Sequence, residues 1–209
     1  MQREKIKELD EETENIRLRH QKILKMTSGN DFLAALPKNL LEVCHKQMKF
    51  TLSCEKRCSQ EKRALMISLI ERNMKVIYEK AWGWDFEAKE FELLGSNSIF
   101  YFLTADDSSF TGFIHFKFEE FMGKIVSFIY DIQLDPDYQH IGLGSILLQA
   151  VEIIATKRRA EGLATMVFKS NPIAIHFFET HGYTIFEMPS KKKQSNSNLQ
   201  HLYFYKALH

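Results

Sequence analysis

The sequence predicts an α/β (α+β) fold in which helices flank a mixed central sheet of about seven strands, preceded by an N-terminal helical arm. Segments rich in aromatic and β-branched residues, each of strand length, recur through the middle and the end of the chain. Segments with apolar residues at helical spacing alternate with some of them. The 209 residues, 44% of them hydrophobic and 26% charged, suffice for one substantial core.

Residues 1–48 are expected to form the arm and a connector. From Gln2 to about Met26 acids and bases alternate around scattered apolar positions, which is typical of a solvated helix that packs one thin stripe. A glycine-containing break follows, and Pro37 marks a short connector. The folded domain is expected to span residues 49–209.

A first strand at 49–54 and a long amphipathic helix are expected to open the domain. The helix is indicated by apolar residues that recur at roughly helical spacing between Gln60 and Lys80, namely Leu65, Leu69, Met74, Val76 and Ile77. Polar or glycine-containing turns then separate three strands, at 99–103, 110–118 and 124–134. We expect these three strands to form an antiparallel meander.

The second half of the domain alternates helix and strand. A helix beginning near Gly142 is predicted from an apolar face made of Leu143, Ile146, Leu147, Ala150, Val151 and Ile154. A second helix is predicted to begin with Asn171 as its N-cap and Pro172 at its first position. The other segments are a strand, a second strand, a polar loop and a last strand, at 164–169, 183–188, 190–198 and 201–206.

Composition argues against several classes of function. A formal net charge of +1 supplies no global attraction to nucleic acid or to a membrane surface. The apolar runs reach only strand length, far short of a bilayer-spanning helix. Three cysteines and a charged N-terminus indicate an intracellular protein. No zinc site is expected, because Cys54, Cys58 and His45 lack a second pair of ligands at zinc spacing.

A glycine-containing turn at the start of the first of these two helices has the chemistry of a phosphate site. It reads Gln139-His140-Ile141-Gly142-Leu143-Gly144 and follows a strand that ends at Asp135-Pro136. N–H groups at a helix N-terminus are unpaired and lie at the positive end of the helix dipole, so they attract phosphate. Alone, such spacing is more often a tight turn, and the G-x-G-x-x-G spacing of a Rossmann fold is missing.

The wider pattern is more specific. A Q-x-x-G-x-G turn after a strand, then helix, strand, an asparagine and a helix ending in His181-Gly182-Tyr183, resembles the GNAT acetyltransferases from about Lys49 to Leu208. Further segments resemble the NatD branch, the Nα-acetyltransferases selective for the N-termini of certain core histones. They are Asn73-Met74 with Tyr78, Trp82-Gly83-Trp84, His115-Phe116-Lys117-Phe118-Glu119 and Tyr130-Asp131-Ile132-Gln133-Leu134.

The resemblance implies a GNAT fold, acetyl-CoA as co-substrate, no metal, and a core-histone N-terminal tail, histone H4 first, as the peptide substrate. It also implies roles for residues. The cofactor would be held by Ile132, Gln133, Leu134, Gln139, His140, Ile141, Gly142, Leu143, Gly144, Ser145 and Asn171. The peptide groove would be lined by Tyr78, Trp82, Glu119, Glu120, Phe121, Tyr130, Met166 and Tyr203.

The reaction needs a neutral amine, because a protonated amine has no lone pair to attack a thioester. A protein N-terminus titrates near about pH 8, roughly two to three units below a lysine ammonium, and needs only modest help from a base. Asp131 is the candidate base, acting through a water, with Tyr130 positioning the amine. Family members usually carry Glu at the place of Asp131. Phe178 stands where many carry the Tyr that protonates the leaving thiolate, so the general acid is unassigned.

Two alternatives remain open at this point. The chain could be a GNAT enzyme for another amine, such as a different protein N-terminus, a lysine or a polyamine, or it could be a non-catalytic acyl-CoA-binding module. Taken alone, Glu119 and Glu120 fit a solvated surface pair, and the two tryptophans fit core packing. We expect a monomer in the nucleus and cytoplasm, without direct nucleic-acid or membrane partners.

Overall fold

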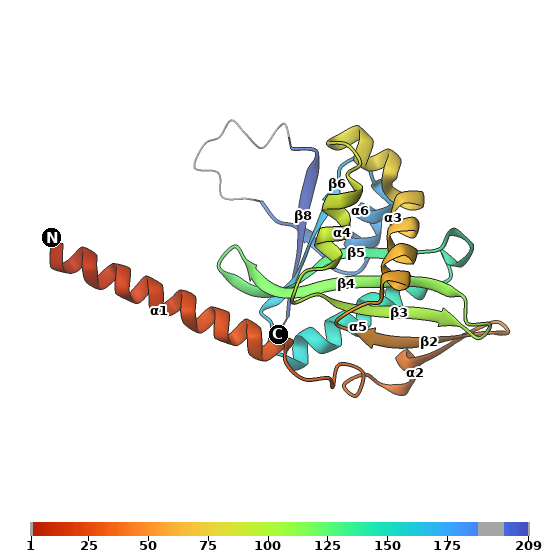
Figure 1. The fold of residues 1–209 in the computed structure, drawn as a ribbon, viewed down its shortest axis with the longest axis horizontal. Coiled ribbons are helices and arrows are strands. Elements are labelled where there is room, and N and C mark those ends of the chain that lie inside the picture. Colours follow the sequence, from red (N-terminus) through yellow and green to blue (C-terminus); the bar gives the residue numbers. More distant parts are fainter. Residues whose placement is uncertain (1, 188–198, 209) are drawn as a thin grey trace.

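The computed structural model describes residues 2–187 and 199–208, with side chains from residue 11 onward. One sheet lies at its centre, helices cover both faces, and a long first helix projects beyond the sheet (Figure 1). The helices are α1 (Gln2–Thr27), α2 (Lys38–Leu41), α3 (Gln60–Ala81), α4 (Phe86–Leu93), the 3-10 turn η1 (Pro136–Tyr138), α5 (Leu143–Lys157) and α6 (Pro172–Thr180).

In the part of the chain that the structure describes, the sheet has eight strands in the order β1-β2-β3-β4-β5-β6-β8-β7. Among these described strands only β5 and β6 run parallel, so the sheet is mixed as expected, and β3, β4 and β5 form the expected antiparallel meander. The strands are β1 (Glu42–His45), β2 (Met48–Glu55), β3 (Ile99–Ala105), β4 (Phe110–Phe121), β5 (Lys124–Leu134), β6 (Gly162–Phe168), β7 (Thr184–Ile185) and β8 (His201–Ala207). The predicted fold class is confirmed.

Three elements differ from the sequence-based expectation. Strand β1 lies in the expected connector and pairs antiparallel with β2, which raises the number of strands from about seven to eight. Helix α4 was not expected, and its N-cap Asp85 accepts a hydrogen bond from the Ala88 N–H at 2.9 Å. Strand β7 is far shorter than 183–188, while residue 188 and the expected loop 190–198 lie outside the described residues.

The apolar stripe expected on α3 is only partly buried. Leu65 and Val76, which belonged to the expected apolar stripe, are 47% and 63% exposed. The residues that are buried are Met66, Ile67, Leu69 and Ile70, which pack with the aromatic side chains of β3 and β4. Apolar residues lie around most of this helix, so contact with the sheet decides which of them are buried.

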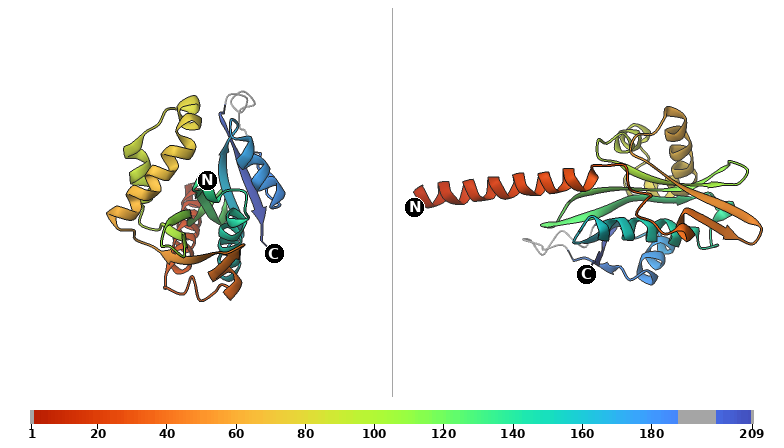
Figure 2. Two further views of the ribbon diagram at one scale, coloured as in Figure 1. Left: turned by 90° about the vertical axis from the view of Figure 1, so that its right-hand side faces the viewer. Right: turned by 90° about the horizontal axis from the view of Figure 1, so that it is seen from below.

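The sheet is covered on both faces, and α5 packs against it through the largest apolar cluster (Figure 2). The predicted apolar face of α5 is correct at Leu143, Leu147, Ala150, Val151 and Ile154, which are all buried, whereas Ile146 is only partly buried. Helices α3 and α4 lie on the opposite face, over a second cluster. Within the described part of the chain, no helix is both long and apolar enough to span a bilayer.

The end of the arm joins the core. Met26 and Phe32 are 4% and 1% exposed and belong to the cluster under α5. The Tyr101 hydroxyl donates a hydrogen bond to the Phe32 carbonyl at 3.1 Å. Residues before position 49 therefore contribute to the core and, through β1, to the sheet, while a domain boundary at 49 stays a prediction.

Candidate active site

The site begins where β5 and β6 separate. The two strands pair only from Val126–Gly162 to Ile129–Thr165, and β5 continues to Leu134 without a partner on that side. The backbone of residues 130–134 is therefore free of sheet pairing toward β6. An opening between two parallel strands, at the point where their pairing ends, is a natural place for a ligand that pairs as a strand would.

A β-bulge lies at the point of separation. His115 pairs with Asp131 and Phe116 with Ile129, so Tyr130 is an extra residue on β5. A bulge re-aims side chains that would otherwise alternate between the faces of the sheet. Here Tyr130 stacks on His115, with ring centroids 5.1 Å apart, and Asp131 contacts Lys89 of α4. Both neighbouring side chains therefore face the side of α3 and α4.

An outer groove of about 410 Å³ runs along β5 toward the start of α5. All residues expected to hold the cofactor line it except Ile141 and Leu143, namely Ile132, Gln133, Leu134, Gln139, His140, Gly142, Gly144, Ser145 and Asn171. Leu143 is 1% exposed and Ile141 packs against the core, so neither side chain faces the groove. Their backbone groups alone are available for the role that the resemblance implied.

The helix end in this groove is open to a ligand. Gly142 is the N-cap of α5, and within residues 2–187 and 199–208 no side-chain capping hydrogen bond is present there. Its φ of +90° lies in the left-handed region that favours glycine, and a Cβ added to it would meet nothing within 4 Å. Unpaired N–H groups and the positive end of the helix dipole therefore face open space, which suits the pyrophosphate of coenzyme A.

An inner pocket of about 80 Å³ lies beside the groove, and its walls include Tyr78, Tyr130, Asp131 and Met166. Ile132, Gln133 and Asn171 line both spaces. Asn171 caps α6 as expected, its side chain accepting a hydrogen bond from the Ala174 N–H at 3.1 Å. The residues expected for catalysis thus lie next to those expected for the cofactor.

Asp131 is 6% exposed and forms an ion pair with Lys89, which is equally buried, at 3.3 Å. The Lys89 ammonium also contacts the Glu92 carboxylate at 2.7 Å. Burial and the nearby Asp131 raise the pKa of Glu92 to about 7, although Lys89 opposes the shift. Two carboxyl groups thus share one ammonium behind the inner pocket.

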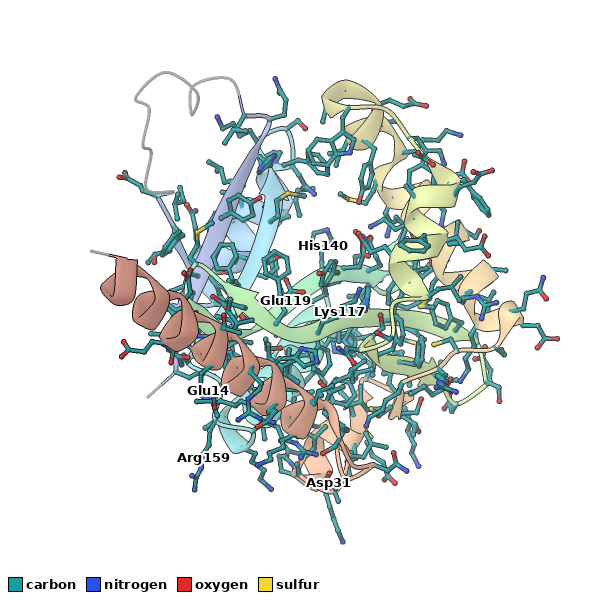
Figure 3. The ribbon with its side chains drawn as sticks, turned by 60° about the vertical axis from the view of Figure 1, so that its left-hand side comes forward. Glu14, Asp31, Lys117, Glu119, His140 and Arg159 are labelled. Atoms are coloured by element: carbon teal, nitrogen blue, oxygen red, sulfur yellow. The ribbon has the colours of Figure 1, made fainter. Side chains whose placement is uncertain are left out.

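Tyr130, which is expected to position the amine, contacts two residues of β4. Its hydroxyl donates a hydrogen bond to the Glu119 carboxylate at 2.7 Å, and the Lys117 ammonium lies 4.5 Å from its ring centroid. Figure 3 shows Lys117 and Glu119 side by side along β4. Burial raises the pKa of Glu119, while the bond from Tyr130 opposes the change. The part of the expected peptide groove that contains Glu119 therefore also contains a lysine.

The remaining residues expected in the peptide groove lie in three places outside the inner pocket. Glu120 forms an ion pair with Arg19 of α1, so it faces the arm. Phe121, 8% exposed, packs with Tyr203 in a small apolar cluster. Trp82 is 54% exposed and contacts the ring of Phe168, a wall of the inner pocket, with centroids 4.6 Å apart.

Sequence reasoning missed several residues of the site. Asn73 of α3 donates hydrogen bonds to the Leu134 carbonyl at 2.9 Å and to Gln133 Oε1 at 3.1 Å. The Gln139 side chain donates to the same Leu134 carbonyl at 3.1 Å. The Asn73-Met74 pair carried part of the resemblance, which was the available signal. No sequence signal indicated that α4 would bring Lys89 to Asp131.

Among the described residues, one group of side chains could supply ligands to a metal ion. Potential ligand atoms of Glu92, His115 and Asp131 all lie within 4.8 Å of one another. The Lys89 ammonium contacts both of the acids, so a cation of the chain itself already balances them.

Comparisons with known proteins agree with this geometry. The sequence profile of the Acetyltransferase (GNAT) family matches residues 64–183. A GNAT-family acetyltransferase from Staphylococcus aureus is 16% identical, with a TM-score of 0.58 over 76% of this chain and 100% of that one. An acetyltransferase from Streptococcus agalactiae is 12% identical, with a TM-score of 0.58 over 75% of this chain and 98% of that one.

A nourseothricin acetyltransferase is 22% identical, with a TM-score of 0.44, and the match covers 53% of this chain and 65% of that one. At identities this low, the likeness to the Staphylococcus aureus and Streptococcus agalactiae proteins shows the fold alone. The family profile covers more than half of the sequence. Acetyl-CoA, which this family uses, suits the unpaired β5 backbone and the uncapped end of α5. The chain belongs to the GNAT family of acetyl-CoA-dependent acetyltransferases.

Proposed function

We propose that the chain acetylates the α-amine of a protein N-terminus, first of all that of a core-histone tail such as histone H4. One observation carries this proposal. The inner pocket, with Tyr130 and Asp131 in its wall, adjoins the groove that suits acetyl-CoA. We further propose that the protein acts as a monomer in the nucleus and cytoplasm.

The chemistry is a direct transfer. Bound acetyl-CoA supplies an activated thioester. The neutral amine nitrogen attacks its carbonyl carbon, a C–N bond forms, and the C–S bond breaks with its electrons leaving on sulfur. Asp131 takes the amine proton through a water, and Tyr130 holds the amine in place. A general acid for the thiolate is not assigned, because Phe178 cannot donate a proton.

The character of the base favours an α-amine. A carboxylate is in general a weak proton acceptor, and the Asp131 carboxylate also contacts the Lys89 ammonium. An α-amine, with a pKa of about 8, is far more often neutral at pH 7 than a lysine amine, with a pKa of about 10.4. A weak proton acceptor therefore suffices for an α-amine and suits a lysine amine poorly.

The test uses a histone-tail peptide with a free N-terminus, the same peptide with a blocked N-terminus, and spermine. Release of free CoA is measured for each. We expect turnover with the free peptide alone. Equal turnover with the blocked peptide would identify a lysine as the acetylated group, and equal turnover with spermine would identify a polyamine as a substrate. Acetyl-CoA binding without any transfer would indicate an acyl-CoA-binding module.

Glu119 is proposed to meet a basic residue of the peptide. Glu119→Gln keeps the shape of the side chain and removes its charge, so the apparent KM for the free peptide should rise about tenfold. The KM for acetyl-CoA should not change. Glu120→Gln is the comparison, because Glu120 is paired with Arg19. If the KM for the free peptide rose in Glu120→Gln but not in Glu119→Gln, the contact would belong to Glu120, and this part of the proposal would be refuted.

A further inference from the structure

Helix α4 places two charged residues behind the proposed base. Lys89 is 6% exposed, and its ammonium lies 3.3 Å from Asp131 Oδ2 and 2.7 Å from Glu92 Oε1. An ammonium buried this deeply is retained only where partners compensate its lost hydration. Burial lowers the pKa of Lys89, but Asp131, Tyr78 and Glu92 outweigh that effect and hold it above its ordinary value. Lys89 is therefore a permanent cation.

A second lysine approaches this group from a neighbouring strand. From β4, Lys117 Nζ donates a hydrogen bond to the Glu92 carbonyl at 3.3 Å and interacts electrostatically with the Glu92 and Glu119 carboxylates, but it forms no ion pair with Asp131. Burial and the two lysines hold the pKa of His115 well below its ordinary value, so this imidazole is neutral.

The aromatic groups facing this cluster are neutral phenols near pH 7. From α3, the Tyr78 ring centroid lies 5.4 Å from the Lys89 ammonium, and burial raises the pKa of Tyr78 to about 12. Burial likewise raises the pKa of Tyr130 above its ordinary value. Lys89 is therefore the cation that directly balances Asp131 and Glu92 together.

We propose that Lys89 and Glu92 are positioning residues for acetyl transfer. Lys89 holds the Asp131 carboxylate in place beside the amine, and Glu92, which shares the same ammonium, sets how readily the pair of carboxyl groups takes up a proton. This inference rests on the proposed function and adds two residues of α4 to it.

The proposal has a consequence that a purely structural role would lack. Without Lys89, the buried Asp131 carboxylate and the partly buried Glu92 carboxylate lie side by side, and such a pair retains a proton to higher pH. With Glu92 made neutral, the ammonium serves Asp131 alone, and the proton is lost at lower pH. Two substitutions one turn apart on α4 should therefore shift the pH dependence of the reaction in opposite directions.

The experiment records kcat/KM against pH with the free N-terminal peptide, calculated on the concentration of peptide whose α-amine is neutral, so that the titration of the substrate near about pH 8 is removed. The acid limb of the unmodified protein is expected near pH 7, where the pKa of Glu92 lies. In Lys89→Met it should move up by about one to three pH units, with activity at neutral pH falling at least about tenfold and recovering at higher pH. In Glu92→Gln it should move down by about one unit or more. Glu87→Gln, which removes an exposed carboxylate from the same helix, should leave the limb in place.

Unshifted limbs, or shifts in the same direction, would overturn the proposal. Should Lys89→Met fail to fold, the nearly isosteric Glu92→Gln decides the question alone. Carbon-13 NMR of the side-chain carboxyl groups gives a readout independent of turnover. A Glu92 carboxyl that titrates near pH 7 and moves upward in Lys89→Met is expected. If that resonance does not titrate there, or does not move, this inference fails, whereas absent acetyl transfer refutes only the proposed function.

Discussion

At the scale of single residues, Gly142 combines a backbone requirement with a functional one. Its φ of +90° is strained for any residue with a Cβ, and that Cβ would point into open space at the end of α5. Gly123, in the turn between β4 and β5, has a φ of +76° and equally open surroundings. Substitutions at the two glycines therefore impose similar backbone strain, but only a substitution at Gly142 takes up space at the start of α5.

Gly142→Ala and Gly123→Ala should each lower the free energy of unfolding by about 1 kcal/mol, because both impose the same strain. Only Gly142→Ala should also weaken acetyl-CoA binding, by about tenfold or more, because it narrows the approach to the N–H groups of α5. Urea unfolding and isothermal titration calorimetry measure the two effects. Equal acetyl-CoA affinity in both variants would exclude this turn as the pyrophosphate site.

His115 should make stability depend on pH. It is fully buried between Phe100 and Tyr130, its Nε2 lies 3.0 Å from Ser98 Oγ, and burial holds its pKa well below 6.5. Below pH 6.5 the unfolded chain takes up a proton that the folded chain refuses, so stability falls as the pH falls from that value toward the lowered one. Above it, His115 contributes no pH dependence.

The expected loss from His115 is about 1 kcal/mol in the free energy of unfolding between about pH 7.5 and about pH 5.5. His115→Phe, which keeps an aromatic ring in the stack, should lose this part of the pH dependence. His176→Gln, at an exposed position of α6, should behave like the unmodified protein. An identical pH dependence of stability in His115→Phe would contradict the assignment.

At the scale of elements, α3 shows why helical spacing predicts a helix better than its buried face. Leu69 was expected inside and is buried, but Leu65 and Val76 are exposed, and Ile70 lies at 0% exposure. Periodicity follows from the helical geometry of the backbone alone. The choice among several apolar positions depends on where β3 and β4 lie, and those strands are distant in sequence.

Ile70→Ala and Val76→Ala test that assignment. Ile70→Ala should lower the free energy of unfolding by about 2–5 kcal/mol, because it leaves a cavity between α3 and the sheet. Val76→Ala should change it by less than about 0.5 kcal/mol, since the side chain is already in solvent. Guanidinium unfolding measures both. A larger loss for Val76→Ala would restore the stripe first expected from the sequence.

At the scale of the whole molecule, α1 extends past the sheet while its C-terminal end is anchored in the core (Figure 1). The side chains of residues 11–18 are all exposed. Arg19 reaches Glu120 of β4, and Met26 is buried. The arm thus has an exposed part and a part on which the fold depends.

Deletion of residues 1–15 should change the unfolding free energy by less than about 1 kcal/mol, because the described side chains in that stretch, residues 11–15, are all exposed to solvent. Deletion of residues 1–36 should lower it by at least about 5 kcal/mol, since Met26, Phe32 and Leu36 leave the core and Tyr101 loses its hydrogen-bond acceptor. Calorimetric melting compares the two. A large loss on the shorter deletion would show that the first fifteen residues pack on the body.

Local patterns in the sequence determined most elements, the α5 apolar face, the Asn171 cap and the glycine turn, because each depends on neighbours within a few residues. They also carried the resemblance that led to the acetyl-CoA groove. Only the tertiary structure decided the bulge at Tyr130, the burial of Lys89 against Asp131 and the pairing of Glu120 with Arg19. Each joins residues far apart in the chain, and such contacts are set by how strands align and helices pack, for which one sequence carries no local signal.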